Sequence, residues 1–158
     1  MTLSAAIEPR GSRRWHSLAL VPLINAILTL LLLCTTAMAQ AEVKGVAFHI
    51  DSDAHMNRSL RQVMRHREAH PTIPLRVILI AGGVRPALEG AMDPNGGLYG
   101  AQMEQLLAEG VRIFACQNTL DSFNKTADDL TFGIETVGSG IAELGRLQVE
   151  LNFGYIKL

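Results

Sequence analysis

Residues 40–158 are predicted to form one α/β domain, in which helices cover both faces of a mostly parallel sheet of about five strands. Three observations favour this class. Short apolar runs alternate with amphipathic helical segments throughout this part of the chain, as expected for a parallel sheet between layers of helices. Glycine or polar turn residues follow most of the apolar runs. No internal repeat, low-complexity tract or linker divides the pattern.

Five segments are predicted as strands because they are short and apolar, and several are rich in β-branched residues. They are residues 43–51, 74–83, 111–116, 134–140 and 153–157. The second segment closes with the pair Gly82 and Gly83, and the fourth closes with Ser139 and Gly140.

Helices are predicted between the strands from the spacing of apolar side chains along one helical face. The clearest are residues 52–70, 98–110 and 140–152, with shorter helical turns at 86–91, 118–123 and 126–131. Ser52 or Asp53 is expected to cap the first helix. The side chains expected to point inward from the last helix are Ile141, Leu144, Leu147 and Leu151.

Residues 1–39 are predicted to be a secretory signal peptide, which would place the mature protein in the periplasm. Three arginines precede an almost wholly apolar run at 18–33, and Ala37 and Ala39 then form an A-x-A cleavage pattern. Cleavage is expected after Ala39, with Ala41 as the second choice. A retained membrane anchor is the alternative, although the apolar run is shorter than the roughly 20 residues that a membrane span needs.

Two variants of the export signal fit less well. An arginine pair matches a twin-arginine signal, but His16 and Ser17 follow where such signals carry apolar residues. Cys34 is preceded by Leu33, which is larger than the small residue usual before a lipidated cysteine. The cleaved signal peptide therefore stays the preferred interpretation.

The charge of the mature chain argues against a nucleic-acid partner. Removing residues 1–39 takes three of 14 basic residues and one of 15 acidic residues, which leaves a net charge of −3. Nucleic-acid binding requires a basic face, and no membrane association is expected after cleavage. Of the two cysteines only Cys116 would remain. That cysteine is then buried and inert, paired between chains, or a working thiol.

Polar and glycine residues stand where the predicted strands end. In open α/β sheets, ligands bind beyond the carboxyl ends of the strands, so these turns are where a site is expected. The candidates are His49, Asp51, Gly82, Gly83, Cys116, Asn118, Thr119, Ser139 and Gly140.

Cys116 is the preferred catalytic residue among them, because a thiolate is a strong nucleophile. A turn that leads into a helix supplies unpaired N–H groups and a positive dipole end, both of which stabilise a thiolate. Such N–H groups also suit the outer sulfur of a persulfide. No cation is adjacent in sequence, so Arg85 is the candidate for one in space. The alternative is a buried structural cysteine, and the residues alone do not decide between the two.

The segment "HIDSDAH" at 49–55 offers alternating His and Asp side chains. His49 is a candidate for orienting the thiol or transferring its proton. The spacing is not that of a known zinc site, and no metal or cofactor is predicted. The chain also lacks the C-x-x-C, G-x-G-x-x-G, Walker and G-x-S-x-G motifs, which argues against dithiol redox, nucleotide-binding and serine-hydrolase functions.

Five segments together resemble the DsrE/DsrF-like family, in its subgroup of small exported members. They are "KGVAFHIDSD", "VILIAGG", "GVRIFACQNTL", "VGSGIAELGRLQ" and the terminal "GYIKL". The resemblance covers nearly all of residues 43–158. Its most specific part is the strand that ends in Cys116 and is followed by Asn118 and Thr119.

The resemblance implies a flavodoxin-like three-layer sandwich that assembles into homotrimers or hexamers. In the sulfur-relay members of the family, a cysteine at the equivalent place carries sulfur as a persulfide and passes it to a partner thiol. Cys116 matches that position, and Asn118, Thr119, Ser139 and Gly140 would line its pocket.

Two functions are therefore expected. The first is a periplasmic sulfur-relay protein that carries sulfane sulfur on Cys116, with donor and acceptor proteins or small sulfane-sulfur compounds as partners. The alternative is a non-catalytic oligomeric module that binds a small ligand or a protein, with Cys116 packed in its interior.

Overall fold

A five-stranded sheet forms the centre of the computed structural model, which describes residues 42–158. The strands are β1 (Gly45–Ile50), β2 (Leu75–Leu79), β3 (Arg112–Cys116), β4 (Glu135–Val137) and β5 (Phe153–Lys157). Every neighbouring pair is parallel, in the order β4-β3-β2-β1-β5. The predicted signal peptide, its cleavage site and Cys34 lie outside the described residues.

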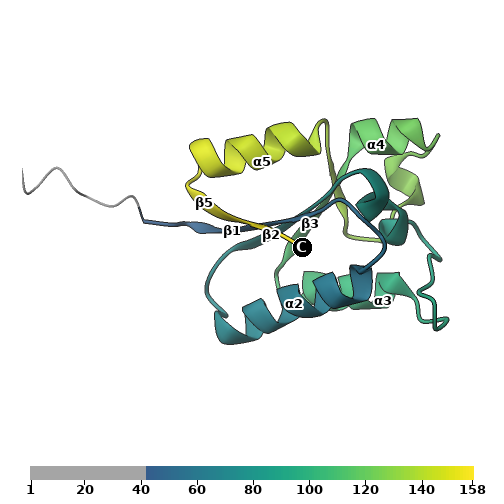
Figure 1. Ribbon diagram of the computed structural model, residues 1–158, viewed down its shortest axis with the longest axis horizontal. Helices are drawn as coiled ribbons and strands as arrows, with labels where there is room; N and C mark the ends of the chain where they lie inside the picture. The colour runs from purple at the N-terminus through teal and green to yellow at the C-terminus, as the bar shows by residue number, and fades with distance from the viewer. Residues whose placement is uncertain (1–41) are drawn as a thin grey trace, which may run out of the picture. The chain divides into compact units, whose positions relative to one another are not determined.

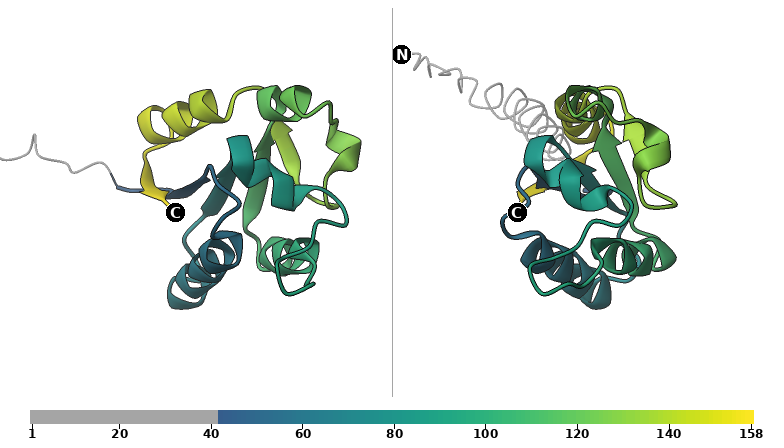
Figure 2. Two further views of the ribbon diagram at one scale, coloured as in Figure 1. Left: turned by 45° about the vertical axis from the view of Figure 1, so that its right-hand side comes forward. Right: turned by 90° about the vertical axis from the view of Figure 1, so that its right-hand side faces the viewer.

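Helices cover both faces of this sheet. They are α2 (Met56–Ala69), α3 (Tyr99–Ala108), α4 (Gln117–Ser122) and α5 (Gly140–Val149), with 3₁₀ turns η1 (Ala81–Ala87) and η2 (Ala127–Asp129). Figure 1 shows α2 and α3 on one side of the sheet and α5 on the other, and the views in Figure 2 agree. The predicted α/β class is therefore confirmed. The edge strand next to β1 is β5, from the C-terminal part of the chain, whereas in flavodoxin the second strand of the chain takes this place.

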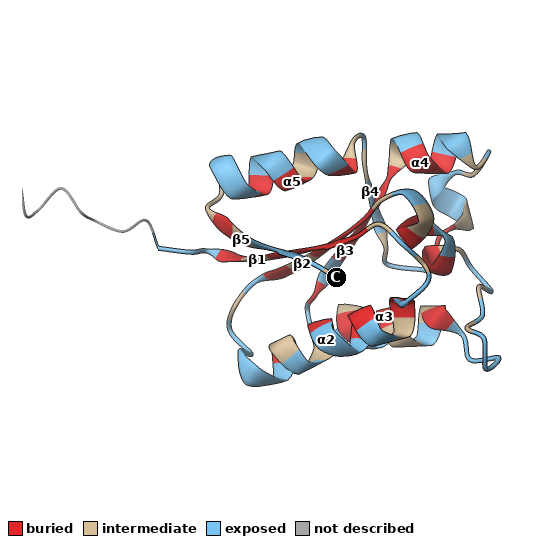
Figure 3. Cartoon of the chain, viewed as in Figure 1, coloured by how far each residue is buried: buried red, intermediate tan, exposed pale blue. Residues whose placement is uncertain are grey.

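Each face of the sheet has its own hydrophobic cluster. Phe48 belongs to the cluster beneath α2 and α3, whereas its neighbour Ala47 belongs to the cluster beneath α5. The two side chains lie on different faces because successive side chains on a strand point to opposite sides of the sheet. Leu144 and Leu147 of α5 complete the second cluster. Figure 3 shows buried residues along the strands and on the inward sides of the helices.

Two predictions about the helices were wrong: Ile141 does not point inward, and neither Ser52 nor Asp53 caps the first helix. Ile141 is exposed because the inward row of α5 starts at Gly140, and the next residue is rotated about 100° away from it. The cap of α2 is His55, and no side chain caps the helix. The Ser52 hydroxyl instead accepts the N–H of Ala54 within the preceding turn.

Two predicted strands extend several residues past the observed carboxyl ends. The second ends at Leu79 rather than at residue 83, because Ala81 has a left-handed backbone (φ 49°) and η1 begins there. The helical turn expected at 86–91 accordingly lies earlier, in η1. The fourth ends at Val137, because Gly140 already begins α5.

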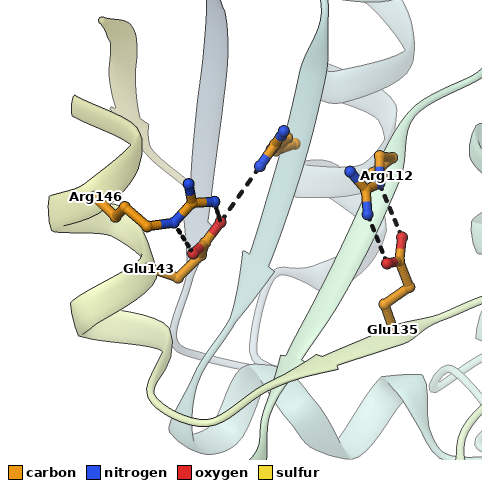
Figure 4. Close-up of polar contacts among 5 residues, drawn as sticks. Arg112, Glu135, Glu143 and Arg146 are labelled. Atoms are coloured by element: carbon orange, nitrogen blue, oxygen red, sulfur yellow. Dashed lines mark hydrogen bonds and ion pairs between the residues drawn. The ribbon is translucent and has the colours of Figure 1, made fainter. Parts of the chain in front are cut away.

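Ion pairs tie the outer elements to the sheet (Figure 4). Arg112 of β3 donates two hydrogen bonds, of 2.9 and 2.6 Å, to Glu135 on the edge strand β4. Glu143 of α5 accepts two hydrogen bonds of 2.8 Å from Arg146, and a third of 3.3 Å from Arg76 of β2. Glu143 thereby links α5 to the sheet.

Candidate functional site

Cys116 is the last residue of β3, and α4 begins at the next residue. In the parallel register, Leu79 of β2 pairs with Ala115, and Val137 of β4 pairs with Cys116. The thiol therefore lies at the carboxyl edge of the sheet, between the turns that follow β2 and β4. Its residue is only 4% exposed and forms no disulfide with the described residues.

Gly140 places the start of α5 against this thiol. Its backbone N–H donates to the Cys116 Sγ at 3.3 Å. A Cβ at Gly140 would lie 2.5 Å from the Ile80 Cγ1 and 3.3 Å from the Cys116 Cβ, so a larger residue could not approach so closely. Ser139 is the cap of α5, and its Oγ accepts the Ala142 N–H at 3.3 Å. The β4–α5 turn is thus shaped to bring a helix N-terminus onto the sulfur.

The pKa of Cys116 is lowered from its ordinary value. Burial raises the pKa of the thiol, but hydrogen bonds from the Gly140 N–H, from the hydroxyl and N–H of Thr119 and from the Asn118 N–H together outweigh burial. They do so because they stabilise the charged form. These hydrogen bonds thereby stabilise the thiolate, which is the role that was expected of the Arg85 cation.

Thr119 has a second contact that joins two turns of the site. Its Oγ1 accepts the backbone N–H of Ala81 at 3.1 Å, and its hydroxyl also helps to lower the pKa of Cys116. Ala81 has a left-handed backbone, which is uncommon for a residue other than glycine. Thr119 is buried and so holds the β2–η1 turn against the start of α4.

A pocket of about 460 Å³ opens beside the thiol and draws its lining from three turns. The predicted site residues that line it are Gly82, Arg85, Cys116, Asn118, Thr119 and Ser139. Within the described part of the chain, Arg85 is the only charged side chain in this lining. Its guanidinium lies 5.0 Å from the centre of the Phe123 ring and 3.3 Å from Asp53.

Sequence reasoning missed the apolar walls of this pocket. Ile80, Phe123 and Ile141 all line it. Ile80 follows an apolar strand, and the exposed position of Ile141 follows from where α5 begins. Strand alternation and helix phase were the signals that could have found them, once the ends of β2 and α5 were known.

Two predicted residues lie elsewhere. His49 and Asp51 do not line the pocket of Cys116, because β2 separates β1 from β3 in the sheet. The Nδ1 of His49 instead shares a 2.9 Å hydrogen bond with the Tyr155 hydroxyl, and Asp51 pairs with Lys157 at 2.5 Å. The geometry therefore gives no support to His49 as a partner of the thiol.

Gly83 also lies outside the lining of this pocket and has a packing role. A Cβ there would collide with the carbonyl oxygen of Ile50, so the glycine lets η1 cross the end of β1 closely. Across residues 42–158, no group of three or more His, Cys, Asp or Glu side chains gathers as a metal site would need. In the same residues no helix has the length and apolar character needed to cross a membrane.

The fold and the site define a class: an α/β protein with one thiol in a pocket at the carboxyl edge of a parallel sheet. A sequence profile of the DsrE/DsrF-like family matches residues 34–156, which is well over half of the chain. The chain therefore belongs to the DsrE/DsrF-like family, as the resemblance predicted. No curated protein matches the sequence.

Solved structures support the same fold. A protein of unknown function, MTH1491 from Methanobacterium thermoautotrophicum, matches with a TM-score of 0.61 and 29% identity, over 72% of this chain and 97% of that one. The ychN protein from E. coli matches with a TM-score of 0.60 and 21% identity, over 72% and 99%. BT1422 from Bacteroides thetaiotaomicron, a conserved protein of unknown function, matches with 0.57 and 17%, over 73% and 95%.

Proposed function

We propose that this protein is a sulfur carrier that holds sulfane sulfur as a persulfide on Cys116. The observation that carries the proposal is the Gly140 N–H, which donates to the Sγ at 3.3 Å from the first turn of α5. The lowered pKa of Cys116 increases the thiolate fraction at neutral pH. Membership of the DsrE/DsrF-like family, which includes sulfur-relay proteins, supports the same chemistry.

The loading step balances without a further reagent. With thiosulfate as donor, the Cys116 thiolate attacks the outer sulfur and forms a new S–S bond. The S–S bond of thiosulfate breaks, and its electron pair leaves with sulfite. Cys116 then carries a persulfide anion. In the unloading step, a partner thiolate attacks the terminal sulfur and Cys116 leaves as the thiolate.

The pocket suits the loaded state as well as the donor. Its volume of about 460 Å³ leaves room for the terminal sulfur beside Cys116. The negative charge of a persulfide would lie near the α5 N-terminus, which favours anions. The positive charge of Arg85 would attract an anionic donor. These features support a donor with a negative group, such as thiosulfate or a polysulfide.

The place and the partners of the relay form part of the proposal. The order of arginines, apolar run and A-x-A pattern in residues 1–39 supports export to the periplasm. Donor and acceptor would then be periplasmic proteins or small sulfane-sulfur compounds. The family resemblance supports assembly into homotrimers or hexamers.

The low exposure of Cys116 favours a second candidate function. A residue that is 4% exposed also fits a non-catalytic oligomeric binding module, in which the thiol is packed and the pocket holds a small ligand or a segment of a partner protein. The two candidates differ in whether Cys116 reacts in the native protein.

Intact mass spectrometry tests the sulfur-carrier function. The purified protein is incubated with thiosulfate or polysulfide, and its mass is measured before and after treatment with a reductant. The expected result is a gain of one sulfur atom that the reductant reverses and that Cys116→Ser lacks. A similar gain in Cys116→Ser, or no gain together with a thiol that alkylates only after unfolding, would contradict it.

A further inference from the structure

A second pocket, of about 620 Å³, lies apart from the thiol. It opens between the start of α2, the 3₁₀ turn η1 and the loop at 91–95, which leads toward α3. Cys116 does not line it, whereas Arg85 lines both pockets. Its volume falls within the range of pockets that hold small molecules. The proposed sulfur chemistry uses none of its other residues.

The charged side chains around this pocket favour an anion. Its lining contains three arginines and two aspartates, which are Arg58, Arg61, Arg85, Asp53 and Asp93. Both aspartates already have partners. Asp53 pairs with Arg85 at 3.3 Å, and Asp93 accepts hydrogen bonds from its own loop and from Asn57. Arg58 and Arg61 form no ion pair with the described residues, so their guanidinium groups are available to a ligand.

Asp93 is bound into its own loop. Its Oδ1 accepts the N–H groups of Asn95 and Gly97, each at 2.8 Å, and its Oδ2 accepts the Asn57 side-chain amide at 2.6 Å. These hydrogen bonds occupy both carboxylate oxygens and spread their charge over three donors. Asp93 therefore shapes the wall of the pocket and repels an anion less than an unpaired carboxylate would.

The N-terminus of α2 also faces this pocket, because the residues from Ala54 to Arg58 line it. No side chain caps this helix of 14 residues, and its first turn contains no acidic residue. The N–H groups at a helix start need acceptors, and the helix dipole adds partial positive charge there. A ligand oxyanion would accept hydrogen bonds from these N–H groups in place of a capping side chain.

Tyr99 supplies an independent sign of a ligand. It is 7% exposed and lines the pocket, yet no hydrogen bond joins its hydroxyl to another group among the described residues. Burial raises the pKa of Tyr99, and so do the charges of Asp93 and Asp53, which line the same pocket. The side chain is thus almost wholly buried while its hydroxyl has no protein partner, and a ligand oxygen in the pocket would be the partner.

Apolar side chains complete the lining. Pro86 is buried beneath the pocket, and Met92 and Pro94 are exposed at its side. We propose that this pocket binds a small organic oxyanion, with its charged group at the α2 N-terminus and the arginines, and its apolar body against Met92 and Pro94. The proposal does not depend on sulfur transfer, because Cys116 lies outside the pocket.

Isothermal titration with phenyl phosphate, benzenesulfonate and benzoate tests the proposal, with benzyl alcohol as the uncharged reference. At least one anion is expected to bind saturably at one site per chain, and more weakly as salt is added. Comparison of the three anions identifies the charged group that the pocket prefers. Cys116→Ser should bind the preferred anion as the unaltered protein does.

Variants locate the binding. Tyr99→Phe removes only the hydroxyl and should weaken binding roughly tenfold, as expected for a lost hydrogen bond to a charged group. Arg61→Gln should weaken it severalfold. Arg65→Gln, on the same helix but outside the pocket, is the matched control and should bind normally. Thermal unfolding of each variant checks that the fold is kept.

Three results would overturn the proposal. They are no saturable binding of any of the anions, equal binding of benzyl alcohol, and equal weakening in Arg65→Gln and Arg61→Gln. Because none of these measurements uses a sulfur donor, failure here leaves the sulfur-carrier function untouched, and failure of sulfur loading leaves this site untouched.

Discussion

The backbone N–H of Gly140 lies 3.3 Å from the Sγ of Cys116, although 24 residues separate the two in the chain. This contact makes the reactivity of the thiol depend on where α5 begins. A change that moves the start of α5 is expected to alter the chemistry of Cys116 even if the cysteine itself is unchanged.

Gly140→Ala should destabilise the protein and slow the alkylation of Cys116. The added Cβ would lie 2.5 Å from the Ile80 Cγ1, so α5 or Ile80 has to move. Overpacking of this kind costs about 1–3 kcal/mol, and the displaced N–H would raise the pKa of the thiol. Urea unfolding and the iodoacetamide rate at neutral pH measure the two effects.

Gly145→Ala is the matched control in the same helix. Nothing lies within 4 Å of a Cβ at Gly145, and alanine is the better helix former, so the variant should gain about 0.5–1 kcal/mol. Its alkylation rate should equal that of the unaltered protein. Equal destabilisation by both substitutions would mean that the close approach at Gly140 is unimportant.

The alkylation rate of Cys116 should reach half of its maximum at a pH below the ordinary pKa of a thiol. Burial raises the pKa, but the hydrogen bonds from Gly140, Thr119 and Asn118 lower it by more than burial raises it. Since the thiolate forms above the pKa, a lowered pKa gives faster reaction at neutral pH. A pH–rate profile with iodoacetamide measures the midpoint. A midpoint above that of a free cysteine peptide would show that burial dominates.

Thr119→Val keeps the shape of the side chain but removes its hydroxyl. The Ala81 N–H would lose its acceptor, at a cost of about 1 kcal/mol, and the pKa of Cys116 would rise. Alkylation should then be slower at neutral pH and equal to that of the unaltered protein at high pH. Rates that differ by the same factor at every pH would instead indicate blocked access to the thiol.

Arg85→Gln should weaken loading by anionic donors selectively. Arg85 is the charged side chain that lines the thiol pocket, so the KM for thiosulfate should rise severalfold. Loading by an uncharged dialkyl trisulfide should be nearly unchanged. Loss of loading with both donors, in a protein that unfolds normally, would mean that Arg85 does not read the charge of the donor.

The protein should lose stability as the pH falls below about 6.5, in part through His49. Burial lowers the pKa of His49 from its ordinary value of 6.5 in the folded state, although Asp51 acts in the opposite direction. The unfolded chain therefore takes up the proton first as the pH falls, and the free energy of unfolding declines below that pH. Above it the contribution is complete.

Urea unfolding at about pH 7.5 and about pH 5 measures this loss. His49→Gln should lose less stability between the two conditions. Some loss should persist, because burial and the nearby His70 also lower the pKa of His66. An unchanged loss in His49→Gln would assign the effect to other groups.

The local part of the site could be predicted from the sequence. Asn118 and Thr119 adjoin Cys116 at a strand-to-helix turn, and such a turn brings their N–H groups to the thiol wherever the strand lies. Ser139 was recognisable as the start of a helix because it precedes an amphipathic run. These inferences need only local geometry, which the sequence pattern determines.

The contacts between strands could not be predicted in the same way. His49 ends a strand as Cys116 does, and only the order β4-β3-β2-β1-β5 shows that another strand lies between them. The contact of Gly140 with Cys116 depends on β4 lying beside β3. The left-handed backbone of Ala81 has no sequence signal, since alanine rarely adopts it.

The short edge strand β4 bears on aggregation. It has three residues, and the ion pair of Glu135 with Arg112 places charge at this edge of the sheet. A short and charged edge is a poor template for the strands of other molecules. Edge-to-edge pairing of folded molecules through β4 is therefore disfavoured, and fibrous aggregates that involve this strand should arise from chains in which the sheet has already opened.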